Sequence, residues 1–145
     1  MSRSQAWFFH LANALVSGTG LVYAWMLYLM EPEDEFSILN HPWQGHVLHA
    51  HLWTAPLLVF AGGMLWHHHA WTRFRQGKQK KRRSGMMLGA SLFPMIFSGV
   101  FLQTAVEPTW RGVWKWVHLV CAALWLIAAI LHPWLQARGE AKASA

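Results

Sequence analysis

WRGVWKWVHLVCAALWLIAAILHPW, residues 110–134, is the stretch that decides the fold, because it is apolar enough to cross a membrane and carries a histidine near each end. His118 and His132 are fourteen residues apart. On an α-helix this spacing is about 40° short of four turns, with a rise of roughly 21 Å. Both imidazoles therefore share one face at two depths. A histidine in hydrocarbon is costly unless it is bonded, so the pair predicts two stacked ligand sites.

The composition is that of a polytopic membrane protein. Of 145 residues, 54% are hydrophobic and only 12% are charged, unlike an average soluble chain. The 11 tryptophans suit membrane interfaces. The one cysteine, Cys121, excludes an internal disulfide and the paired cysteines of a covalent haem site. Metal or cofactor ligation must then rest on the 10 histidines.

Four apolar runs predict an all-α protein, a membrane four-helix bundle in a single domain over residues 1–145. Helices are expected at about residues 6–30, 44–71, 85–106 and 111–136. An acidic, proline-broken loop joins the first two, and a basic loop at 72–84 joins the second to the third. The sequence shows no internal repeat with a period of about 20 to 50 residues.

The positive charges predict the orientation. Four spans place both termini and the basic loop on one side, with ten Lys and Arg residues there against Arg111 and Lys115 on the other. The positive-inside rule makes the N and C termini cytoplasmic and predicts a multi-pass membrane protein surrounded by lipid. The net charge of +6 is explained by topology and does not indicate nucleic-acid binding.

The histidines then sort by depth. His10 and His132 lie at similar distances from the cytoplasmic ends of the first and fourth helices. His49 and His118 lie near the outer ends of the second and fourth. Bis-histidine ligation of a haem needs two imidazoles from facing helices at matched depth, and these residues meet that requirement twice.

Two ligand positions stay open. His51 is about 200° around the helix from His49, so the two cannot share a face and either can be the outer ligand. His67 lies about five turns from His49 on the same face, so it competes with His10 as the inner ligand. The others are expected at interfaces or in loops: His41, His46, His68 and His69.

Other residues support a flat, anionic ligand. Arg111 and Lys115 share the face of His118 at the outer boundary, where haem propionates need cations, although both side chains can also snorkel to headgroups. Several helix glycines offer room for a porphyrin plane: Gly18, Gly20, Gly62, Gly63 and Gly99.

FHLANA at residues 9–14, followed by SGTG at 17–20, resembles the first helix of four-helix dihaem cytochromes b. These are the membrane subunits of respiratory formate dehydrogenase and nickel-iron hydrogenase, and the bacterial cytochrome b561 group. In the formate dehydrogenase type, the first-helix and second-helix ligands are 39 residues apart and the two fourth-helix ligands 14 apart, as here. The resemblance implies two haem b groups, with His49 and His118 as the outer pair of ligands and His10 and His132 as the inner pair.

The resemblance also implies a function. The chain is expected to be the electron-transfer membrane subunit of a larger oxidoreductase complex. It would carry electrons across the bilayer between an extracytoplasmic iron-sulfur or multihaem cytochrome subunit and the quinone pool. His67, His68 and Arg73 lie at a suitable depth for a quinone site near the inner haem.

Two alternatives remain. One is a stand-alone cytochrome b561-like oxidoreductase that acts on a small molecule such as superoxide. The other is a haem-free membrane protein whose histidines bind a transition-metal ion. A soft-metal carrier is expected to offer more cysteines or paired methionines, and the 7 methionines here are scattered.

Overall fold

The computed structural model describes residues 2–66, 71–75 and 82–141, with the backbone alone at 73–74, 82–84 and 132–141. All regular secondary structure in these ranges is helical. The helices are α1 (Arg3–Tyr28), α2 (Gln44–Leu65), α3 (Thr72–Arg75), α4 (Arg82–Thr104) and α5 (Pro108–Ala141). The predicted all-α class is confirmed.

Four segments are long and apolar enough to cross a membrane: Arg3–Tyr28, Gln44–Leu65, Gly85–Thr104 and Pro108–Leu131. They correspond to the four predicted helices. Large apolar side chains on them point outward, and the indoles of Trp7 and Trp53 are 73% and 81% exposed. Helices that satisfy their own backbone groups and expose apolar surface are suited to lipid, so the chain has the character of a multi-pass membrane protein.

The ends of the helices follow from local capping. Helix α1 begins at Arg3, earlier than predicted, because Ser2 and Gln5 form a capping box. In it, the Gln5 N–H donates to Ser2 Oγ at 3.2 Å and the Ser2 N–H donates to Gln5 Oε1 at 3.0 Å. Helix α5 begins at Pro108, also earlier than predicted, because a proline is preorganised for the first helical position.

The second predicted helix was expected to run to residue 71. Helix α2 ends at Leu65, α3 begins at Thr72, and residues 67–70 lie outside the described part of the chain. Pro56 lies inside α2 and Pro94 inside α4. Membrane helices accept such prolines where neighbouring groups satisfy the freed carbonyls.

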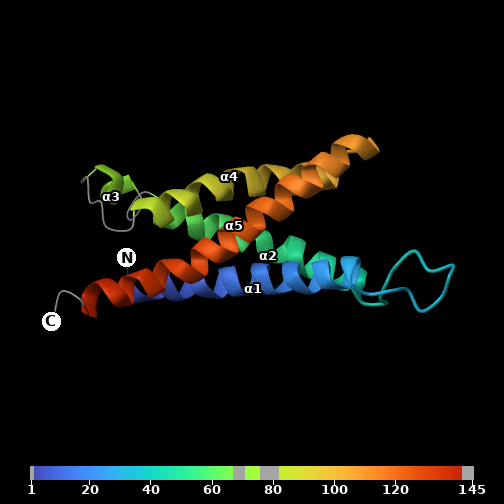
Figure 1. Cartoon of the computed structure of the whole chain (residues 1–145), viewed down its shortest axis with the longest axis horizontal. Helices are drawn as coiled ribbons and strands as arrows, with labels where there is room; N and C mark the ends of the chain where they lie inside the picture. Colours follow the sequence, from blue (N-terminus) through green and yellow to red (C-terminus); the bar gives the residue numbers. More distant parts are fainter. Residues whose placement is uncertain (1, 67–70, 76–81, 142–145) are drawn as a thin grey trace. The chain divides into compact units, whose positions relative to one another are not determined.

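The chain forms two compact units, residues 1–72 and 73–145. In the first unit α1 packs against α2, and in the second α4 packs against α5 (Figure 1). Each unit is a helical hairpin. The connection in the first hairpin is long (29–43), whereas that in the second is three residues (105–107).

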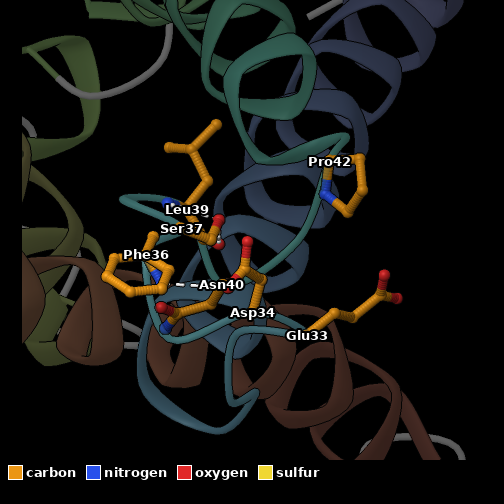
Figure 2. Close-up of a pocket in the computed structure, with 7 residues that line it drawn as sticks. All are labelled: Glu33, Asp34, Phe36, Ser37, Leu39, Asn40 and Pro42. Carbon is orange, nitrogen blue, oxygen red and sulfur yellow. Dashed lines mark hydrogen bonds between the residues drawn. The ribbon is translucent and has the colours of Figure 1, made fainter.

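The long connection of the first unit is bonded to both of its helices. Asn40 Nδ2 donates to Leu27 O at 3.0 Å, and the Asn40 N–H donates to Gln44 Oε1 at 3.0 Å. Upstream, Asp34 Oδ1 accepts the Phe36 N–H at 3.1 Å. Figure 2 shows this loop around a hollow lined by Glu33, Asp34, Phe36, Ser37, Leu39, Asn40 and Pro42.

Candidate functional site

The imidazole of His51 joins α2 to α1. Its Nδ1 lies 3.0 Å from Val16 O and 3.3 Å from Thr19 Oγ1. The Thr19 hydroxyl lies 2.8 Å from Leu15 O, so it donates its hydrogen there and can accept from the imidazole. We call Val16, Thr19, Gly20 and His51 the first imidazole site.

The imidazole of His118 joins α5 to α4 in the same way. Its Nδ1 lies 3.0 Å from Met95 O and 3.2 Å from Ser98 Oγ. The Ser98 hydroxyl donates to Pro94 O at 2.6 Å, and its side chain is fully buried. We call Met95, Ser98, Gly99 and His118 the second imidazole site.

The bonding partners determine the tautomer at both sites. A backbone carbonyl can only accept a hydrogen bond, so Nδ1 must carry the proton that it shares with Val16 O or Met95 O. In the neutral imidazole the lone pair then belongs to Nε2. A histidine with an Nδ1–H bonded to a carbonyl and with Nε2 as its basic nitrogen is the form that coordinates metals.

A glycine lies against each imidazole. A Cβ on Gly20 would be 2.9 Å from His51 Cε1, and a Cβ on Gly99 would be 3.4 Å from His118 Cε1. Contacts below 3.0 Å essentially never occur for a real Cβ, so a side chain at position 20 would require the ring of His51 to move. Gly99 has slightly more room. The sequence suggested these two glycines as space for a porphyrin, and the structure places a histidine ring against each.

The number of helical residues between the hydroxyl residue and the histidine, with the loop left out, is the same in both sites. Nine residues of α1 follow Thr19 and seven of α2 precede His51, whereas six of α4 follow Ser98 and ten of α5 precede His118. Both totals are sixteen. The sequence separations, 32 for Thr19 to His51 and 20 for Ser98 to His118, differ by twelve residues. That difference equals the difference between a connection of 15 and one of 3 residues, so the totals match although hydroxyl and imidazole lie at different distances from the loop in the two hairpins.

Other predicted ligands lie elsewhere on the helices. His10 on α1 and His49 on α2 are exposed. His46 is also exposed and contacts the ring of Trp43, with ring centroids 5.8 Å apart. His41 in the loop accepts the Trp43 N–H at 3.1 Å. Of the two candidates left open on the second helix, only His51 is described with bonds to a neighbouring helix.

Several predicted residues lie outside what the structure describes. These are His67 and His68, together with the side chains of Arg73 and His132. Each predicted haem pair joins a residue of the first unit to a residue of the second, so both pairs stay predictions. The two predicted propionate contacts are both described: Arg111 is exposed, and Lys115 Nζ lies 5.5 Å from the ring centroid of Trp116.

The hydroxyls of Thr19 and Ser98 were not recognised from the sequence as part of a site. The available signal was a hydroxyl residue followed by glycine in an apolar run, Thr19-Gly20 and Ser98-Gly99. Ser17-Gly18 has the same pattern, yet a Cβ on Gly18 would meet no atom within 4 Å. The pattern alone therefore does not identify a site.

Among the described residues, no three His, Cys, Asp or Glu side chains gather where they could hold a metal ion between them. Comparison of the chain with protein-family models, with curated proteins and with solved structures finds no match.

Proposed function

We propose that this chain is a b-type membrane cytochrome that holds two haems and carries electrons between an extracytoplasmic redox partner and the quinone pool. The observation that supports the proposal is the pair of matching imidazole sites, at His51 and His118. A single bonded histidine in a membrane helix can serve a purely structural role. Two with the same tautomer, the same kinds of acceptor and a glycine against each ring favour a shared role in ligation.

The residues present fit a haem. Haem b would supply reversible one-electron transfer at its iron, with histidine imidazoles holding it. In this chain, Val16 O and Thr19 Oγ1 orient the ring of His51, and Met95 O and Ser98 Oγ orient the ring of His118. Nε2 is then the nitrogen that would take the iron. The single Cys121 agrees with a haem held without covalent attachment.

The local geometry favours His51 over His49 as the partner of His118 in the outer haem pair. His49 is exposed, whereas the ring of His51 is fixed by two oxygens of α1. A ligand whose orientation is fixed before the metal binds loses less entropy on binding. For the inner haem, the proposed ligands are His10 and His132, with His67 as the rival of His10.

The proposed function also assigns roles to the rest of the chain. In this proposal the four spans form one bundle with both termini in the bacterial cytoplasm, and Arg111 and Lys115 lie near the propionates of the outer haem. The acidic loop, residues 31–42, faces outward toward an iron-sulfur or multihaem partner subunit. Quinone reacts near the inner haem, beside His67, His68 and Arg73.

The first experiment is a haem count. Protein purified in detergent should show a reduced-minus-oxidised spectrum of b-type haem with two haems per chain. His118→Ala and His51→Ala should each remove one haem, and the same one. His49→Ala is the matched control on α2 and should retain both. Wild-type protein without haem would refute the proposal. Loss of the outer haem in His49→Ala but not in His51→Ala would overturn the choice of ligand.

Purification from the native membrane separates the proposal from its two alternatives. An iron-sulfur or multihaem subunit that co-purifies would support a membrane subunit of a larger complex. A lone dihaem protein that is reduced or oxidised by superoxide would instead support the stand-alone oxidoreductase. Zinc or copper without haem would support the metal-binding protein.

A further inference from the structure

We infer that Thr19 and Ser98 are positioning residues, whose hydroxyls hold the Nδ1 proton of His51 and His118 and so set the orientation and basicity of the Nε2 that binds iron. The inference rests on the proposed function and deepens it. It concerns two side chains whose hydroxyls contact Nδ1 of His51 and His118 and would act through these imidazoles.

The direction of each hydrogen bond follows from the distances. Thr19 Oγ1 is 2.8 Å from Leu15 O, and Ser98 Oγ is 2.6 Å from Pro94 O. Each hydroxyl has one hydrogen, and the carbonyl of its own helix takes it. The oxygen lone pairs therefore face the imidazoles, at 3.3 Å for His51 and 3.2 Å for His118. Each Nδ1–H is shared between a hydroxyl and a carbonyl.

The hydroxyl adds something that the carbonyl alone does not supply. Val16 O and Met95 O lie inside α1 and α4, where each is also the acceptor for the helix's own N–H four residues later. The hydroxyl gives Nδ1–H a second acceptor beside the carbonyl, with Thr19 Oγ1 3.2 Å from Val16 O and Ser98 Oγ 3.1 Å from Met95 O. Two acceptors restrict rotation of the ring about its bond to Cβ. They also increase electron donation from Nε2, since a hydrogen-bonded Nδ1–H makes imidazole a stronger base.

The experiment uses the full-length protein and removes one hydroxyl at a time. Thr19→Val and Ser98→Ala should retain two haems per chain. The outer haem is identified as the one lost in His51→Ala and His118→Ala. In Thr19→Val and Ser98→Ala this haem should become easier to reduce, by up to about tenfold in the ferric-to-ferrous equilibrium, or ~59 mV for one electron. The electron paramagnetic resonance spectrum of that ferric haem should broaden, because its ligand ring takes a wider range of orientations.

Conservative variants and a buried control separate this role from a purely structural one. Thr19→Ser and Ser98→Thr retain a hydroxyl and should restore the wild-type potential. Ser91→Ala is the matched control. Ser91 is buried on α4, two turns before Ser98, and its hydroxyl donates to Met87 O at 2.8 Å and Leu88 O at 3.3 Å on its own helix. The control should change neither potential nor spectrum.

The outcomes are distinct. If the protein holds two haems and both hydroxyl variants match Ser91→Ala in potential and spectrum, the inference is wrong while the proposed function stands. If a hydroxyl variant loses haem and its conservative counterpart does not restore it, the hydroxyl is not the cause and the inference is again wrong. Wild-type protein without haem refutes the proposed function and this inference with it.

Discussion

Gly20 lies directly against the imidazole of His51, so closely that a methyl group on Gly20 would be 2.9 Å from His51 Cε1 and 3.2 Å from Nδ1. A side chain here requires the ring to move, and a ring that moves loses its contacts with Val16 O and Thr19 Oγ1. The distance from a Cβ position on each glycine to the nearest other atoms separates crowded glycines from those with open space around them.

Gly20→Ala should give a lower thermal unfolding midpoint than Gly18→Ala, because displacing the ring loses about 1 kcal/mol of hydrogen bonding. Gly18→Ala is the control. Nothing lies within 4 Å of its Cβ position, and alanine should stabilise the helix by up to about 1 kcal/mol. Gly99→Ala, with 3.4 Å to His118 Cε1, should fall between them. An increase in stability for Gly20→Ala equal to that of Gly18→Ala would contradict the contact. Unfolding in detergent micelles measures all three.

Glu107 should make the stability of α5 depend on pH. Its carboxylate accepts the Trp110 N–H at 2.8 Å and the Thr109 N–H at 3.0 Å, and these bonds lower the pKa of Glu107 below 4.5. A carboxyl group with a lowered pKa stabilises the fold above its unfolded pKa, and this contribution is lost as pH falls through the folded pKa.

The measurement compares the unfolding midpoints of wild type and Glu107→Gln between neutral and acid pH. The stability of wild type relative to Glu107→Gln should fall as pH drops below 4.5. The difference should be constant above that range, where the carboxylate is charged in both states. Parallel pH profiles for the two proteins would show that the helix start does not depend on the charge of this carboxylate.

Asn40 should hold the long loop to the first hairpin. Its side chain satisfies Leu27 O, one of the last carbonyls of α1, which lack partners within the helix. Asn40→Ala and Asn40→Asp both remove the donor and should each cost about 1 kcal/mol of unfolding free energy. Ile38→Ala is the control, since Ile38 is 97% exposed. If Asn40→Asp unfolds like wild type, the bond to Leu27 contributes nothing measurable.

Phe101 and Trp114 should be coupled energetically across the second hairpin. Their rings are stacked, with centroids 4.4 Å apart and planes 17° from parallel. A double-mutant cycle with Phe101→Ala and Trp114→Ala should give a coupling energy of roughly 0.5 to 1.5 kcal/mol. The cycle of Phe101→Ala with Trp116→Ala, on a 64% exposed indole, should give a value near zero. Equal coupling in both cycles would mean that the stack is not its source.

Hydropathy was sufficient to predict the four spans, because the length of an apolar run is a property of the sequence alone. Hydropathy was not sufficient to predict where the helices start. The caps at Ser2 and Glu107 extend α1 and α5 by three residues beyond their predicted starts, since a capping side chain stabilises the first turn whatever its hydropathy.

Spacing alone did not show which of His49 and His51 packs against polar groups of a neighbouring helix. Two residues on one helix define two faces, and only the packing of α1 shows which face meets a polar neighbour. The roles of Thr19 and Ser98 could not be predicted either, because a hydroxyl in an apolar helix usually bonds to its own backbone. Both do so here, at Leu15 O and Pro94 O, and the second bond to an imidazole depends on a helix that is distant in sequence.

The sixteen helical residues that separate hydroxyl from imidazole in each hairpin have a consequence for the loops. Because this helical total is the same, the difference in sequence separation between the two sites is set by the connection alone, which has 15 residues in the first hairpin and three in the second. The twelve additional residues of the first connection lie outside both imidazole sites, in a loop that holds His41.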